Sequence, residues 1–311
     1  MKEKFLSITF VGILFIFFAL GIIFKDQKIS LLERRYLTTK ETLNKDPFTN
    51  LDAYLSDQFP FRNTFLSLYS FFDRVILGNK ENNNIYKKGK VLIEKNYPLQ
   101  EKNIEKFSQK INTIAEKYLN KDNRVFYALL PDKSYFLEEK EYQKLNFQKL
   151  IKKVEKEIVL PYINLIPLFQ LQDYYNTDIH LKQEAYQKVV EVLAKNYNFS
   201  LQNIFWKQQK NNNFYGSSYA KGAYFAKPEE LNFYTNSWTE QADVWHLEYG
   251  KKKVYNQEEL ASLDAYNIFL SGPSAYVEIN SPNALSEKEL ILFRDSFGSS
   301  LAPLLLPYYK K

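Results

Sequence analysis

Three residues of this chain, Asp178, His180 and Ser296, have types and surroundings suited to acyl-transfer chemistry. Ser296 follows four consecutive apolar residues, 290–293, which predict a short buried strand, and it precedes a helical pattern. A serine in a turn between a strand and a helix is accessible, and it lies beside free backbone N–H groups at the positive end of the helix dipole. A nucleophilic hydroxyl and the oxyanion that it creates require these features. The alternative is that Ser296 only caps the helix.

The chain has two histidines that could act as the base for this serine. His180 comes two residues after Asp178, and in an extended segment their side chains would share one side. An aspartate that orients the imidazole and stabilises the imidazolium would complete a Ser-His-Asp triad. Alternatively, Asp178 or Thr177 caps the helix that follows, and His180 lies in its first turn. His246 lies in an alternating segment typical of a strand, and we expect it to be a strand-surface residue without a catalytic role.

The composition excludes several other classes of site. The 311 residues include no cysteine and two histidines, so a disulfide, a thiolate metal site and a cysteine nucleophile are ruled out. A multi-histidine metal site is not expected either. The net charge is +6, but the lysines are scattered among glutamates and asparagines, which indicates a solvated surface rather than a nucleic-acid groove. We therefore expect no metal, no cofactor and no nucleic-acid partner.

The N-terminus predicts a membrane anchor. Residues 5–24 carry no charge and follow Lys2 and Lys4, and a helix of that length is about 30 Å long, which matches the hydrocarbon core of a bilayer. The lysines favour a cytoplasmic N-terminus and leave the rest of the chain outside the cell membrane. We predict a cytoplasmic tip and transmembrane anchor over residues 1–25 and a tether over residues 26–50. A cleaved signal peptide is the alternative.

Residues 51–311 predict one α/β domain. Helical spacing and short buried runs alternate along it, with helices at 104–118, 147–158 and 182–197 and strands at 125–130 and 162–166. This alternation is typical of a parallel sheet flanked by helices, and a hairpin is expected around Gly89. Residues 200–285 are rich in aromatic residues, Asn and Gly, and predict a strand-rich insertion. Because the chain ends soon after Ser296, we also expect a truncated C-terminus.

Two segments that hold these candidate residues resemble a known family. Residues 174–186, YYNTDIHLKQEAY, are similar to the TDxHW…GAY signature of the DHHW and alginate O-acetyltransferase (AlgJ/AlgX-like) group of SGNH-hydrolase-like proteins. Residues 290–309, LILFRDSFGSSLAPLLLPYY, resemble the nucleophile-serine segment of that group. Three further matches occur in the family's order, namely YLSDQFPFRNTF at 54–65, NNNIYKKGKVLIEKN at 82–96 and FYALLPDKSYF at 126–136.

The match has departures. Ile179 and Leu181 stand where a DHHW run has its second His and its Trp, and Glu184 stands where the signature has glycine. The loss of the Trp removes a flat surface that could pack against a sugar. This departure concerns the identity of the acceptor more than the chemistry.

The resemblance implies an SGNH-like α/β domain in which Ser296 is the nucleophile, His180 the base and Asp178 the residue that orients the base. It implies an extracytoplasmic O-acetyltransferase that acts on a cell-wall or secreted polysaccharide, with a membrane-bound O-acyltransferase partner as the acetyl donor. A glycan acetyl esterase with the same triad and a non-catalytic glycan-binding subunit are the alternatives. For contacts with the oxyanion or substrate we expect the backbone N–H of Ser296 together with groups from another loop. The candidates are the loop 131–134, which contains Lys133, and the pair Gly216 and Ser217.

Overall fold

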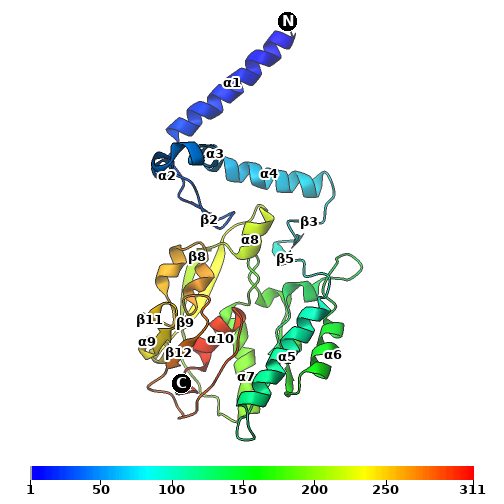
Figure 1. Cartoon of the computed structure of the whole chain (residues 1–311), viewed down its shortest axis with the longest axis vertical. Helices are drawn as coiled ribbons and strands as arrows, with labels where there is room; N and C mark the ends of the chain where they lie inside the picture. Colours follow the sequence, from blue (N-terminus) through cyan, green and yellow to red (C-terminus); the bar gives the residue numbers. More distant parts are fainter. Residues whose placement is uncertain (1) are drawn as a thin grey trace. The chain divides into compact units, whose positions relative to one another are not determined.

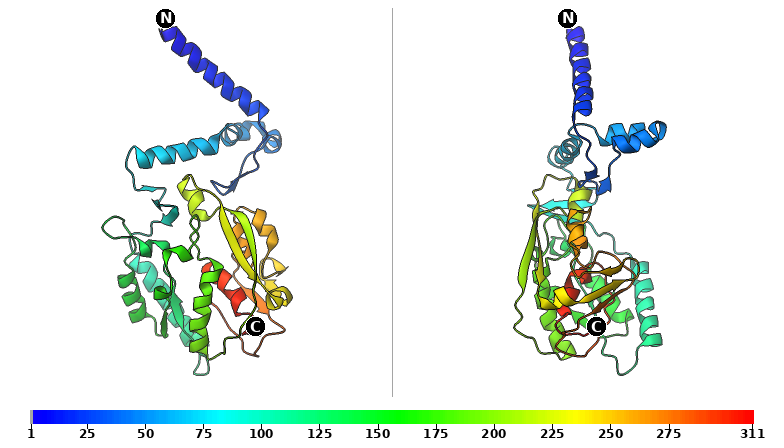
Figure 2. Two further views of the ribbon diagram at one scale, coloured as in Figure 1. Left: turned by 180° about the vertical axis from the view of Figure 1, so that it is seen from behind. Right: turned by 90° about the vertical axis from the view of Figure 1, so that its left-hand side faces the viewer.

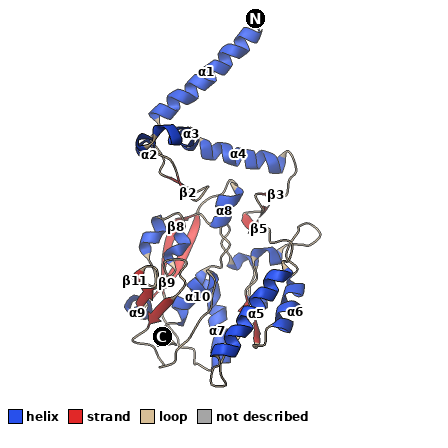
Figure 3. Ribbon diagram, in the orientation of Figure 1, coloured by secondary structure: helices blue, strands red, loops and turns tan. Residues whose placement is uncertain are grey.

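The computed structural model describes residues 2–311 as a mixed α/β protein with two compact units. The first unit comprises the chain through Asn83 together with Tyr219–Ala226, and the second comprises Asn84–Ser218 and Lys227–Lys311. Figure 3 shows short strands distributed among helices and loops. We describe each unit by itself.

The first unit is built around a long apolar helix. Its elements are α1 (Lys2–Ile23), β1 (Ile29–Ser30), β2 (Arg35–Tyr36), α2 (Lys40–Lys45), α3 (Pro47–Asp57), α4 (Arg62–Val75), β3 (Glu81–Asn82) and most of α8 (Ser217–Gly222). Lys4–Ile23 is the one helix of the described residues that is long and apolar enough to cross a membrane, with a mean hydropathy of 2.7 and no buried part. Within this unit, α3 and α4 run across the end of α1 (Figures 1 and 2).

The second unit contains the predicted hairpin and the predicted alternation of helices and strands. Strands β4 (Ile85–Lys88) and β5 (Val91–Glu94) pair antiparallel on either side of Gly89, whose φ of +59° suits glycine. Strand β6 (Tyr127–Leu129) pairs with β7 (Tyr162–Asn164) in parallel. Helices α5 (Glu101–Tyr118) and α6 (Phe147–Glu157) contribute to one apolar cluster with β6, which includes Ile104, Val154, Tyr127 and Leu129.

The predicted parallel sheet is smaller than expected. The pair of β6 and β7 is the only parallel pairing among residues 2–311, and the strand expected at residues 290–293 is a loop. Ile291 is 83% exposed and Phe293 is 70% exposed, so the apolar run is not buried. The physical reason is that a strand requires a neighbour for its N–H and C=O groups, and no strand of the described chain pairs with this segment.

Residues 200–285 contain strands and short helices. Strands β8 (Lys207–Phe214) and β9 (Glu229–Thr235) pair antiparallel, and β10 (Asp243–His246) lies between β11 (Gly250–Lys252) and β12 (Val277–Asn280). Phe214 and Leu231 of the first pair and Val244 of β10 belong to one buried cluster. A short helix, α9 (Ser237–Gln241), connects the two sheets.

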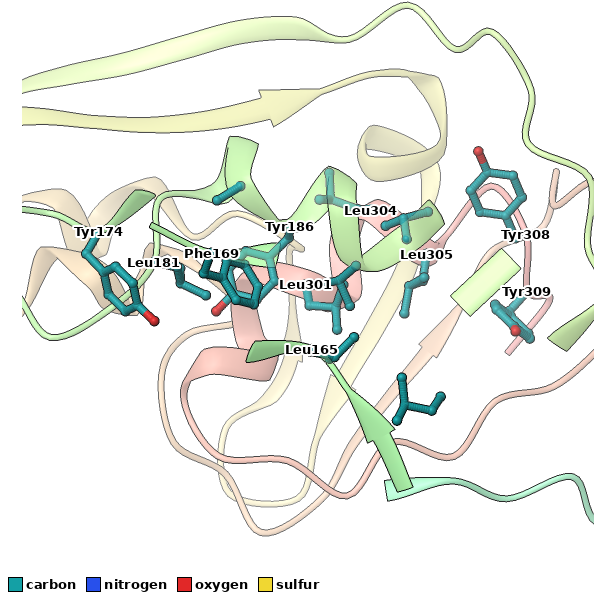
Figure 4. Close-up of a cluster of buried hydrophobic side chains, with 14 residues drawn as sticks. Leu165, Phe169, Tyr174, Leu181, Tyr186, Leu301, Leu304, Leu305, Tyr308 and Tyr309 are labelled. Carbon is teal, nitrogen blue, oxygen red and sulfur yellow. The ribbon is translucent and has the colours of Figure 1, made fainter. Parts of the chain in front are cut away.

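A second apolar cluster brings the C-terminal helix to the segment that follows His180. Helix α10 (Phe297–Leu305) contributes Leu301, Leu304 and Leu305, and these pack with Leu181 and with residues of α7 (Gln187–Tyr197) (Figure 4). All three leucines are less than 10% exposed. The burial of these side chains therefore places the N-terminus of α10 near residue 180.

Candidate active site

Asp178, His180 and Ser296 form one continuous chain of hydrogen bonds. His180 Nδ1 lies 2.5 Å from Asp178 Oδ1, and His180 Nε2 lies 2.7 Å from Ser296 Oγ. Asp178 and His180 are buried, whereas Ser296 is exposed at the N-cap position of α10. The structure thus brings together the three residues that the sequence singled out, in the geometry of a nucleophile, its base and the carboxylate that orients the base.

The Asp178 carboxylate is held by hydrogen bonds to both of its oxygens. Oδ1 accepts the backbone N–H of His180 at 3.0 Å, and Oδ2 accepts the N–H of Ser217 at 2.7 Å. Burial by itself would raise the pKa of Asp178, but the charge of His180 and these hydrogen bonds outweigh it and hold that pKa well below its ordinary value. Asp178 therefore stays ionised at neutral pH.

Gly216 is required for the close approach of this loop to Asp178. A Cβ atom on Gly216 would lie 2.2 Å from Asp178 Cβ, which no side chain tolerates. The Gly216 N–H donates to Thr177 Oγ1 at 3.1 Å. The backbone of residues 216–217 thus packs directly on the segment that carries the aspartate.

Glu229 accepts four hydrogen bonds from the two residues before Asp178. Oε2 accepts the backbone N–H and the Nδ2 of Asn176 at 2.7 and 3.1 Å. Oε1 accepts the N–H and the Oγ1 hydroxyl of Thr177 at 2.7 and 2.5 Å. A carboxylate in β9 therefore fixes the backbone that leads into the Asp-x-His segment.

Lys133 binds the same segment through its carbonyl groups. Its Nζ donates to the carbonyl oxygens of Tyr175 and Asn176 at 3.0 and 3.2 Å, and its side chain is buried. Burial lowers the pKa of Lys133 to about 8, although the charges of Asp178 and Glu229 partly oppose this shift. Lys133 and Glu229 together bind the C=O and N–H groups of residues 175–177.

The His180 ring is oriented by aromatic neighbours. It stacks on Tyr266 with a centroid distance of 3.7 Å and an interplanar angle of 6°, and Phe297 lies 4.9 Å away. A hydrogen bond of 2.8 Å joins the Tyr266 hydroxyl to Ser300 Oγ in α10. Because burial raises the pKa of Tyr266 far above its ordinary value, its hydroxyl stays protonated.

The residues expected to contact an oxyanion or substrate lie close to Asp178, and several of their donors already bind neighbouring groups of the protein. The N–H groups of Gly216 and Ser217 bind Thr177 and Asp178, and Lys133 Nζ binds two carbonyl groups. The backbone N–H of Ser296, in contrast, donates to no acceptor within residues 2–311. It is a free donor beside the serine hydroxyl.

His246 lies in β10, as the alternating sequence predicted, but its ring is fully buried. Neither ring nitrogen has a hydrogen-bond partner in the described part of the chain. Burial lowers the pKa of His246, so it is neutral near pH 7. Within residues 2–311 no group of three His, Cys, Asp or Glu side chains is placed to hold a metal ion.

Sequence reasoning did not identify Glu229 or Tyr266. Glu229 contacts residues more than fifty positions away, and Tyr266 contacts a ring 86 positions away. Neither residue belongs to a motif near the triad in sequence. Residue type gives no local signal either, because Glu230 is the next residue of the same strand.

Comparison with known proteins finds solved structures with a similar fold. No protein-family model matches the chain, and no curated protein matches it in sequence. A DHHW family protein from Eubacterium siraeum DSM 15702 superposes with a TM-score of 0.58 at 17% identity, over 74% of this chain and 81% of that one. PatB1 from Bacillus cereus superposes with a TM-score of 0.57 at 18% identity, over 73% of this chain and 85% of that one. The similarity is one of fold. PatB1 with a sulfonyl adduct superposes equally well, with a TM-score of 0.57 at 18% identity, over 73% of this chain and 82% of that one.

Proposed function

We propose that this protein is a membrane-anchored, extracytoplasmic O-acetyltransferase that acetylates hydroxyl groups of a cell-wall or secreted polysaccharide. The observation that carries the proposal is the continuous chain from Asp178 through His180 to an exposed Ser296. The fold similarity to a DHHW family protein supports the same proposal, because it agrees with the family resemblance of the segments that hold Asp178, His180 and Ser296. The anchor would be α1, with the rest of the chain outside the membrane.

In the first half-reaction His180 Nε2 takes the proton of Ser296 Oγ as this oxygen attacks the acetyl carbonyl of the donor. The N–H of Ser296 is free to stabilise the oxyanion. When the tetrahedral intermediate collapses, the proton passes from His180 to the departing group of the donor, and an acetyl ester remains on Ser296. A membrane-bound O-acyltransferase partner would supply the acetyl group.

In the second half-reaction a sugar hydroxyl replaces the donor. His180 takes the proton of this hydroxyl as its oxygen attacks the acetyl-serine, and then returns a proton to Ser296 Oγ as that oxygen leaves. The ionised Asp178 stabilises the imidazolium in both halves. Water in place of the sugar would give an acetyl esterase, so the acceptor decides between the two activities.

The proposal is tested with the full-length protein in vesicles, an activated acetyl ester and a soluble glycan. We expect mass spectrometry to find an acetyl group on Ser296 after a rapid acid quench, and acetylated glycan at longer times. We also expect a sulfonyl fluoride to modify Ser296 and to stop turnover, because sulfonyl reagents form adducts with activated nucleophiles. If the glycan neither becomes acetylated nor reduces the release of free acetate, the protein is an esterase. Absence of any acyl-serine would refute the mechanism.

A further inference from the structure

Helix α4 exposes an apolar face and buries serine side chains, which is the reverse of an amphipathic helix in a water-soluble protein. Two of its serines, Ser67 and Ser70, are buried against the protein, and Ser70 Oγ donates to the Gly222 carbonyl at 3.0 Å. Its large apolar residues face outwards, and the side chains at positions i, i+3, i+7 and i+11 are 46–62% exposed, namely Phe65, Leu68, Phe72 and Ile76. In water the opposite arrangement is stable, so this face is built for another environment.

Helix α3 also exposes apolar side chains. Leu51 and Leu55 are 47% and 54% exposed, whereas Tyr54 and Asp57 on the other side of the helix are buried. Asp57 is held there by Arg35 and by the backbone N–H of Thr38. We use the name apolar stripe for the six outward residues of the two helices, Leu51, Leu55, Phe65, Leu68, Phe72 and Ile76.

The stripe is in contact with the helix that is apolar enough to cross a membrane. Phe17 of α1 stacks on Phe59 with a centroid distance of 5.3 Å. The ring centroid of Phe65, which belongs to the stripe, lies 5.9 Å from that of Phe17. Phe17 precedes the end of α1 at Ile23 by six residues, which corresponds to about 9 Å along the helix. Interfacial helices insert their apolar face by about 5–10 Å, so Phe65 lies at the depth of such a helix.

We propose that the apolar stripe inserts into the lipid interface of the membrane that α1 crosses. The inference rests on the proposed anchor. Residues 24–83 carry nine Lys or Arg and eight Asp or Glu, so the charge of this segment does not select acidic headgroups or a polyanion. The interaction is therefore one of apolar area with hydrocarbon, and α3 and α4 lie in the plane of the membrane surface.

A depth measurement on the full-length protein in phosphatidylcholine vesicles tests this inference. The chain has no cysteine, so one introduced cysteine is a unique site for a fluorescent label. The test position is Phe72→Cys, with Leu68→Cys as a second exposed position on the stripe, and the matched control is Asn63→Cys, which is exposed on another side of α4. Phe10→Cys in α1 reports the anchor itself.

We expect nitroxide-labelled acyl chains to quench the labels at positions 72 and 68 at least about twofold more than the label at 63. Aqueous iodide should show the reverse order, and about 1 M salt should leave both patterns unchanged. The inference would be overturned if iodide quenched the labels at 72 and 63 equally while lipid quenched the label at Phe10. The anchor would still be supported in that case. A label at position 72 that neither quencher reaches would also overturn the inference. If this protection weakens when the protein is diluted with more lipid, a second copy of the chain covers the stripe. Absence of lipid quenching at Phe10 would refute the anchor and this inference together.

Discussion

Replacement of Glu229 by Gln should separate the positioning of the triad from its chemistry. The substitution keeps the size of the side chain and exchanges one carboxylate oxygen for an NH₂ group. At present the two oxygens accept two hydrogen bonds from Asn176 and two from Thr177. In the variant one oxygen can keep two of these bonds, and the NH₂ group faces donors that it cannot bind.

The magnitude follows from these lost contacts. A hydrogen bond to a charged group contributes about 1.5–3 kcal/mol, so two lost bonds correspond to at most about 3–6 kcal/mol. Because Glu229 is only half-buried, water replaces part of this loss, and we expect the free energy of unfolding to fall by about 2 kcal/mol. Displacement of Asp178 and His180 by a fraction of an ångström should lower kcat by about 10–100-fold.

The assay is steady-state hydrolysis of an activated acetyl ester well below the melting temperature, with circular dichroism to confirm folding. We expect kcat to fall while KM stays within about twofold, since Glu229 contacts the loop and not the substrate. Glu230→Gln is the matched control, because Glu230 is the next residue in β9 and forms only an exposed ion pair with Lys210 at 3.0 Å. A folded Glu229→Gln variant with the kcat of the Glu230→Gln control would refute the positioning role.

Three further predictions concern single residues. Ser296→Ala should lower ester turnover by about 10³-fold or more with an unchanged melting temperature, and a variant with normal turnover would mean that the serine is only a helix cap. Gly216→Ala should lower both turnover and thermal stability, because its Cβ would lie 2.2 Å from Asp178 Cβ, and a variant normal in both assays would contradict the close packing. Burial, with the charge of Arg294, lowers the folded pKa of His246 below 6.5, so the unfolded chain binds the proton more tightly and stability should fall as the pH drops below about 6.5. Denaturant titrations should show that this fall is smaller in His246→Phe, and an identical pH dependence in the two proteins would count against a buried neutral ring.

Much of the fold was predictable because it is encoded locally. The helical spacing of apolar residues predicted α5, α6 and α7 to within a few residues, and Gly89 between two short apolar runs predicted the β4–β5 hairpin. Helices and hairpins are closed by hydrogen bonds between near neighbours in sequence, so near neighbours suffice to indicate them.

Other features depend on residues far away in sequence and were not predictable. Residues 290–293 have the composition of a buried strand, but a strand forms only against a partner, and the described chain provides none. The spacing of apolar residues in α4 indicates a helix but not which face packs against the protein. An amphipathic helix usually packs its apolar face, but in α4 the face with Ser67 and Ser70 is buried.

The sequence by itself predicted the pairing of Asp178 with His180, because the side chains of residues two apart share one side of an extended segment. It also limited the base for Ser296 to two histidines. Only the tertiary structure decided which of them lies beside Ser296. Leu301, Leu304 and Leu305 of α10 bury their side chains in the same cluster as Leu181, and this packing brings Ser296 to His180 across 116 residues, while the ring of His246 is enclosed in β10. Such a choice depends on which apolar surfaces are buried together, and no local pattern of residues encodes it.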